Sequence, residues 1–290
     1  MYLARLFIFV SLFSSASTFA QQESYYYNFW NVQQYYLPAM TGIENKHEAV
    51  VFGRDQWIEL NGRPRTINVQ YAQKLEKINS GIGFIYQVQK IGYSQVQKAK
   101  LSYAYHLKLG EKQLLSFGTN VGLNFLQFKA DWVPPTTGPD PSLPSEKLQT
   151  NFSADFGVNY KHSNWQIGLG MTQLTDQRKT DSFTFTYARH YYLQSSYKFR
   201  FGEQMELTPR LLFQTDFVKI AGTLNVQFKV NRRLQVGLAA RNTKSLGANV
   251  GCYFLKKFYL GYSAQITFGP IMDLNKFYTH EAVLSFTIPN

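Results

Sequence analysis

The chain alternates between apolar and polar or small residues over long stretches. From Leu115 to Phe125 one parity reads Leu, Phe, Thr, Val, Leu and Phe, whereas the other reads Ser, Gly, Asn, Gly and Asn. The same alternation recurs over residues 151–160, 223–230 and 258–268. Because successive side chains of a strand point to opposite faces, this pattern predicts strands with one apolar face and one polar face.

About fourteen such strands are predicted along the chain, at residues 47–55, 65–75, 80–90, 95–109, 112–128, 149–162, 164–174, 188–201, 204–216, 219–231, 233–242, 245–254, 257–268 and 277–288. They are roughly twice as long as ordinary strands of ~5–6 residues. Their length matches the ~9–11 residues that a tilted membrane strand needs. An even number of strands is typical of single-chain bacterial membrane barrels.

The connections between the predicted strands differ in length on the two sides. After even-numbered strands they are tight, at Gly110–Glu111, His162–Ser163, Gly202–Glu203, Arg232 and Lys256. After odd-numbered strands several are long, notably residues 129–148 and 175–187. A β-sandwich would show the same alternation of side chains, but this asymmetry is typical of outer-membrane barrels with periplasmic short turns. We therefore predict an all-β fold, a transmembrane antiparallel up-and-down barrel over residues 47–290.

Residues 1–20 have the layout of a secretory signal peptide. Arg5 precedes the apolar run Leu6–Phe13, and small residues lead to Ala20. The apolar run is shorter than the ~20 residues of a membrane-spanning helix, which disfavours an uncleaved anchor. Cleavage is expected near Ala20, with the mature barrel in the outer membrane. Residues 21–46 are predicted to form a periplasmic N-terminal segment able to plug the lumen.

Composition agrees with this compartment. The formal net charge is +12 and aromatic residues make up 17% of the chain. In an exported protein, a basic balance favours contact with outer-membrane lipid or an acidic partner rather than nucleic acid. The aromatic excess is expected in girdles at the two membrane interfaces.

Charged residues recur on the polar parity of three predicted strands. A Lys or Arg on the lipid face costs about 2–4 kcal/mol at the membrane midplane, so these side chains are expected in the lumen or near its rims. One interpretation is a basic lumen that receives an acidic peptide or plug; the other is a set of solvated, paired charges with no ligand. The predicted lumen-facing residues are Lys98, Lys100, His106, Lys108, Lys198, Arg200, Glu206 and Arg210.

No catalytic or metal site is predicted. His106, His190 and His280 lie on different strands without metal-ligand spacing. Ser102 and His106 share a strand, but both are expected to face the lumen, where a membrane phospholipase could not use them. The prediction is a non-enzymatic protein without a cofactor.

Several stretches resemble the PorP/SprF family. They are Arg54–Trp57 followed by the turn Gly62–Thr66, then Leu101–Leu109, Leu115–Gly118, Arg189–Tyr192 and His280–Phe286. The family's opening Asn-Pro-Ala turn is replaced here by Leu37, Pro38 and Ala39.

The resemblance implies an outer-membrane component of the type IX secretion and gliding machinery. Its partners would be other type IX secretion components and a large adhesin, or the C-terminal targeting domain of other secreted cargo, which it helps to secrete and anchor at the surface. Arg54, Trp57, Arg63 and Pro64 are the candidate partner-binding residues. A general porin-like solute channel with a basic lumen is the alternative function that the lumen-facing charges suggest.

Overall fold

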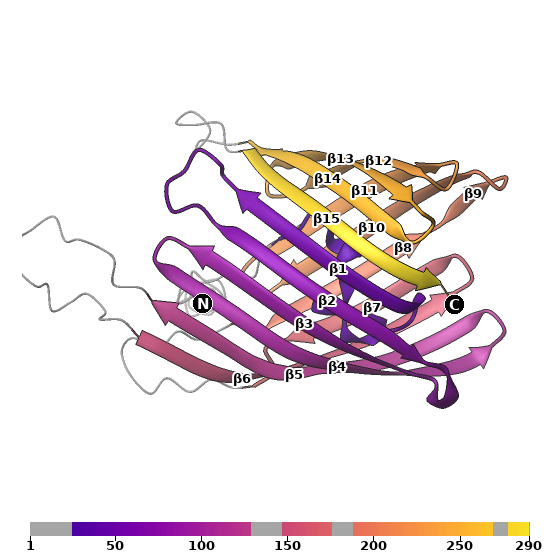
Figure 1. The fold of residues 1–290 in the computed structure, drawn as a ribbon, viewed down its shortest axis with the longest axis horizontal. Helices are drawn as coiled ribbons and strands as arrows, with labels where there is room; N and C mark the ends of the chain where they lie inside the picture. Colours follow the sequence, from indigo (N-terminus) through magenta and orange to yellow (C-terminus); the bar gives the residue numbers. More distant parts are fainter. Residues whose placement is uncertain (1–24, 129–146, 176–187, 269–277, 290) are drawn as a thin grey trace, which may run out of the picture.

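The computed structural model describes residues 25–128, 147–175, 188–268 and 278–289. The predicted signal peptide and most of the two predicted long loops lie outside these residues. The described chain forms antiparallel strands that wrap into a barrel (Figure 1).

Each strand pairs with its neighbours in sequence, except that β8 and β9 both pair with β10, and the first strand pairs with the last, so the barrel is closed. The strands are β1 (Asn45–Gln56), β2 (Arg65–Leu75), β3 (Ser80–Ile91), β4 (Ser94–Gly110), β5 (Gln113–Phe128), β6 (Lys147–His162), β7 (Trp165–Thr172), β8 (His190–Tyr197), β9 (Phe199–Phe201), β10 (Met205–Thr215), β11 (Ile220–Val230), β12 (Leu234–Arg241), β13 (Ser245–Phe254), β14 (Phe258–Thr267) and β15 (Tyr278–Pro289). This confirms the predicted up-and-down barrel.

One predicted strand, residues 188–201, is interrupted at Lys198 and becomes β8 and β9. Both pieces pair with β10, so the described residues form a barrel of fourteen strands. Pro209 of β10 lies where this interruption occurs and has no N–H to donate. The register along β10 is continuous on both sides of the interruption, so Pro209 produces a local opening and no bulge.

The two faces of the barrel wall have opposite polarity. On β5, Phe117 and Leu123 are each 40% exposed on the outside, whereas Ser116 and Asn120 are 0% exposed on the inside. A sandwich would bury its apolar face, so the exposed apolar surface fits a lipid solvent. Aromatic pairs such as Tyr197–Phe199 and Tyr191–Phe217 lie near opposite ends of the strands, in the places expected for interfacial girdles.

The two ends of the barrel differ, and we call them the short-turn end and the long-loop end. The short-turn end carries the connections 76–79, 111–112, 163–164, 202–204, 231–233 and 255–257. The long-loop end carries the connections 57–64, 129–146, 173–189 and 268–277 together with three short turns. No helix in the described ranges is long and apolar enough to cross a membrane.

Candidate functional site

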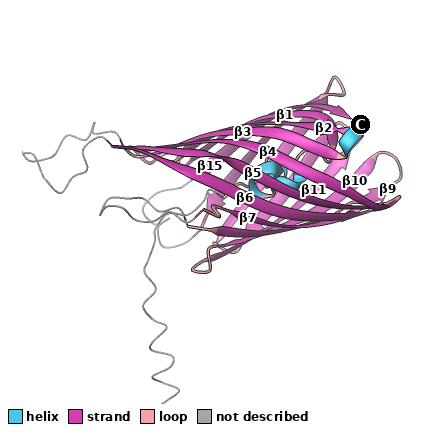
Figure 2. Ribbon diagram, turned by 90° about the horizontal axis from the view of Figure 1, so that it is seen from below, coloured by secondary structure: helices cyan, strands magenta, loops and turns pink. Residues whose placement is uncertain are grey.

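Residues 25–44, which we call the N-terminal insert, lie inside the barrel and continue directly into β1. The insert contains η1 (Phe29–Asn31), α2 (Gln33–Tyr36) and η2 (Pro38–Met40), which Figure 2 shows in cyan among the strands. A four-residue helix is far too short to be stable alone. Tyr26, Tyr36 and Leu37 are each 0% exposed, so the insert is ordered by its contacts with the wall.

Glycines on the inner face of the wall make room for the insert backbone. A Cβ atom at Gly81 would lie 2.1 Å from the Thr41 carbonyl oxygen, and one at Gly170 would lie 2.2 Å from the Tyr36 carbonyl oxygen. A Cβ atom at Gly118 would lie 2.4 Å from the backbone of both Pro38 and Ala39. Since side chains at these positions would collide with backbone, the wall is shaped for this insert.

Glu281 of β15 holds the insert at the long-loop end. Its carboxylate accepts hydrogen bonds from the backbone N–H groups of Tyr27 (2.9 Å) and Asn28 (2.8 Å). The Arg54 guanidinium lies 3.4 Å from the same carboxylate, and both side chains are almost fully buried. Arg241 donates to the Tyr26 carbonyl oxygen at 3.4 Å. This end of the lumen is therefore closed by aromatic residues and a buried charge cluster.

A second buried ion pair lies beside the middle of the insert. The Lys100 ammonium is 2.7 Å from the Asp155 carboxylate, with side-chain exposures of 3% and 0%. Asp155 also accepts hydrogen bonds from the Asn120 side chain and the Gln173 backbone N–H. Asn120 donates to the Gln34 carbonyl oxygen, which connects this network to the insert.

The same part of the wall binds two insert side chains directly. Gln34 donates to the Ser102 hydroxyl at 2.8 Å, and Lys98 donates to the Tyr35 hydroxyl at 3.0 Å. Polar wall residues thus supply hydrogen bonds to buried polar groups of the insert.

At the short-turn end the last residues of the insert make polar contacts with the wall. His106 lies 3.0 Å from the Thr41 carbonyl oxygen, and the Lys161 ammonium lies 2.7 Å from the Glu44 carboxylate. Burial acts to raise the pKa of the Glu44 carboxyl, but the ammonium groups of Lys161 and Lys198 outweigh it and hold that pKa below its usual value. Glu44 is therefore ionised at neutral pH.

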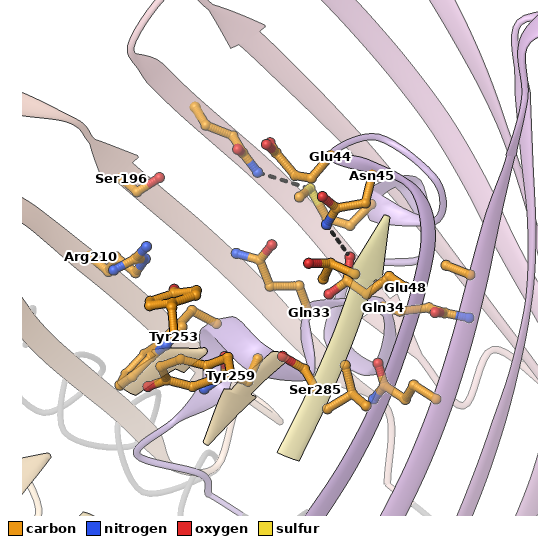
Figure 3. Close-up of a pocket in the computed structure, with 18 of the residues that line it drawn as sticks. Gln33, Gln34, Glu44, Asn45, Glu48, Ser196, Arg210, Tyr253, Tyr259 and Ser285 are labelled. Atoms are coloured by element: carbon orange, nitrogen blue, oxygen red, sulfur yellow. Dashed lines mark hydrogen bonds between the residues drawn. The ribbon is translucent and has the colours of Figure 1, made fainter. Parts of the chain in front are cut away.

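A cavity of about 290 Å³ lies between the insert and the wall in this half of the barrel. Figure 3 shows Arg210 and Ser196 on one side of it and Glu44 and Glu48 on the other. Aromatic and amide side chains form much of the remaining lining, including Trp30, Gln33, Gln34, Tyr253 and Tyr259.

The structure divides the predicted lumen-facing residues into three groups. Lys98, Lys100 and His106 are buried against the insert or its network. Lys198 and Arg210 line the cavity, and Glu206 is half-buried near it. Lys108 and Arg200 are exposed near the short-turn end. Glu281, Asp155 and Arg241 were not predicted as site residues, although each occupies an inward position of its strand.

The candidate partner-binding residues are not gathered in one place. Trp57, Arg63 and Pro64 lie in the connection between β1 and β2 at the long-loop end, where Arg63 forms a 2.6 Å ion pair with Asp55. Arg54 instead points into the lumen and is 7% exposed. Its contacts are with Glu281 and with the ring of Tyr26, so it positions the insert.

The variant Glu281→Gln is expected to loosen the start of the insert. A glutamine has one acceptor oxygen in place of the carboxylate pair, and it leaves Arg54 without a counter-charge. An unsatisfied buried donor costs about 1–3 kcal/mol, so chymotrypsin should cut beside Tyr26 and Tyr27 about 5- to 150-fold faster. The control is Glu59→Gln, at an exposed carboxylate in the β1–β2 connection. Equal cleavage rates in the two variants would contradict this role.

A closed antiparallel barrel with an apolar outer face and a polar lumen defines an outer-membrane β-barrel protein. A family model described as "Type IX secretion system membrane protein PorP/SprF" matches residues 18–286. The chain therefore belongs to the PorP/SprF family of type IX secretion outer-membrane proteins.

Solved structures show the same fold at low sequence identity. The outer membrane protein Omp33 of Acinetobacter baumannii is 11% identical, with a TM-score of 0.52, covering 86% of this chain and 100% of that one. The toluene transporter TbuX of Ralstonia pickettii is 9% identical, with a TM-score of 0.52, covering 87% of this chain and 92% of that one. The search of curated proteins returned no match.

Proposed function

We propose that this barrel supports the secretion and surface anchoring of a large adhesin, or of other cargo with a C-terminal targeting domain. The observation that carries the proposal is a lumen filled by the chain's own insert in a member of a secretion family. A barrel filled in this way is suited to holding a partner rather than passing solutes. Its role is non-enzymatic, and its partners are the cargo and other type IX secretion components.

The orientation follows from the connections. Short turns face the periplasm in bacterial barrels of this type and long loops face outward. The cavity beside Glu44 then opens toward the periplasm, and the β1–β2 connection with Trp57 and Arg63 faces the cell surface. We propose this connection as a contact surface for anchored cargo.

Deletion of the gene is expected to remove one large protein, or a small set, from the cell surface. The measurement is surface biotinylation followed by mass spectrometry, with the culture medium analysed in parallel. Cargo that accumulates inside the cell indicates a role in secretion, and cargo released to the medium indicates a role in anchoring. Complementation with the intact chain should restore display. Unchanged surface display in the deletion strain would refute the proposal.

A solute channel is the second candidate, because the cavity is polar and two predicted basic residues line it. This function requires a continuous path past the insert. Conductance of the intact protein in a planar bilayer would support the channel, whereas electrical silence together with lost surface display would support secretion.

A further inference from the structure

The cavity at the short-turn end has one cationic wall. Lys198 lies at the interruption between β8 and β9, and Arg210 lies on the adjacent strand β10. The Arg210 guanidinium stacks 5.5 Å from the ring centroid of Trp30 and donates to the Gln227 side chain. The Lys229 ammonium lies 3.7 Å from the ring centroid of Tyr253, another lining residue.

These cations interact with the carboxylates around them only at distances longer than an ion pair. Within the described residues, neither Lys198, Arg210 nor Lys229 takes part in an ion pair, whereas Glu44 is paired with Lys161. Glu206 lies 4.0 Å from Arg200 and accepts a hydrogen bond from the Thr208 hydroxyl.

Glu48 is the remaining carboxylate of the lining, and it accepts a hydrogen bond from the Asn45 side chain. The local balance of charge is therefore positive. A cationic wall of this kind favours an anion in the space it faces.

The cavity is accessible from one end and closed at the other. The side chains of Glu44 and Lys161 at the short-turn end keep 36% and 29% of their surface exposed. At the long-loop end Tyr26, Tyr27 and Glu281 are at most 2% exposed. A ligand entering past Glu44 would thus meet Lys198, Arg210 and the aromatic surface of Trp30, and go no further.

We propose that this cavity binds a carboxylate, whose oxygen atoms are bound by Lys198 and Arg210. The rings of Trp30, Tyr253 and Tyr259 would pack against the carbon chain of the ligand. Its volume of about 290 Å³ is at the lower limit of small-molecule pockets, ~300–1,000 Å³. It fits one or two acidic side chains of a peptide that enters from the short-turn end, or a small free dicarboxylate. The site does not depend on whether the barrel serves secretion or solute uptake.

The test measures binding to the full-length folded protein in detergent micelles. The probe is a fluorescein-labelled hexaglutamate peptide, followed by fluorescence anisotropy, with labelled hexaglutamine as the uncharged comparison. The intact protein should bind hexaglutamate and not hexaglutamine. Displacement of the probe by millimolar succinate would identify a small-carboxylate site, and resistance to succinate would identify an acidic-peptide site. Both patterns support carboxylate binding.

The decisive variant is Lys198→Gln combined with Arg210→Gln. Loss of two charge-assisted contacts should weaken hexaglutamate binding by at least about tenfold. The matched control is Arg232→Gln with Lys256→Gln, which removes the same charge from exposed short turns. It should leave binding within about twofold of the intact protein.

A third variant separates weakened binding from misfolding. Glu48→Gln removes the opposing carboxylate and should strengthen binding severalfold, which damage to the fold would not do. The proposal is overturned if the Lys198–Arg210 double variant binds as tightly as the intact protein. It is also overturned if the exposed-turn control loses as much affinity, because binding would then be a nonspecific effect of net charge.

Discussion

Deletion of residues 25–41 is expected to turn an electrically silent barrel into a conducting one. The insert fills the lumen, and the wall of fourteen strands that would remain is intermediate between side-chain-filled barrels and open porins. Without the insert, the polar inner face would be hydrated. Planar bilayer recordings should show discrete conductance steps for the deletion variant and none for the intact protein.

A point variant tests the same expectation without shortening the chain. Leucine at Gly118 would collide with the backbone of Pro38 and Ala39, so Gly118→Leu should expel this part of the insert and give intermittent conductance. Gly53→Leu is the matched control, because a Cβ atom at Gly53 would meet nothing within 4 Å. If both the deletion variant and Gly118→Leu fold yet remain silent, the insert is not what closes the lumen.

Replacement of Lys100 by methionine is expected to cause the largest loss of stability of any single change considered. It leaves the buried Asp155 carboxylate without its ammonium partner, and breaking a buried pair in this way typically costs about 3–5 kcal/mol. Asp155 keeps hydrogen bonds from Asn120 and Gln173, which places the expected loss toward the lower figure. Urea unfolding in detergent, followed by the gel shift between folded and unfolded barrel, measures the free energy of unfolding.

Two further variants give this measurement its controls. Lys108→Met changes the same residue type on the same strand at an exposed position and should alter the free energy of unfolding by less than about 0.5 kcal/mol. Lys100→Met combined with Asp155→Asn removes both charges and should recover part of the loss. A loss below about 1 kcal/mol in Lys100→Met alone would show that the pair is not important for stability.

The alternation of side chains, taken together with the length of the strands and the unequal connections at their two ends, was enough to predict the barrel wall. A strand has a period of two, and in lipid one whole face must be apolar, so the pattern persists through nearly every strand. The exception is the interruption at Lys198, which occurs beside Pro209 of the neighbouring strand. Because Pro209 has no N–H to donate, the pairing between β8 and β10 ends there. Proline alone signals that some opening occurs, but not which neighbour is interrupted.

The arrangement of the insert was much harder to predict. Its helical pieces are too short to leave a periodic pattern, and its order comes from contacts with wall residues far away in sequence. A signal did exist in the wall, where glycines occupy inward positions of β3, β5, β6 and β7: Gly81, Gly83, Gly118, Gly157, Gly168 and Gly170. Inward parity also identified Lys100. It did not reveal the pairing with Asp155, because parity gives the face of a residue but not its neighbour across the lumen.

The hydrogen bonds between Glu281 and the insert backbone affect how the barrel is assembled. Glu281 lies on the final strand, and the backbone groups that it binds are 254 and 253 residues away. Contacts between such distant parts of a chain form late and slowly during folding. The final strand both pairs with β1 at the seam and binds the insert, so closing the seam and filling the interior stabilise each other. The closed barrel is therefore most stable when the insert occupies its native position, and a barrel with a misplaced insert lacks part of the stabilisation of its seam.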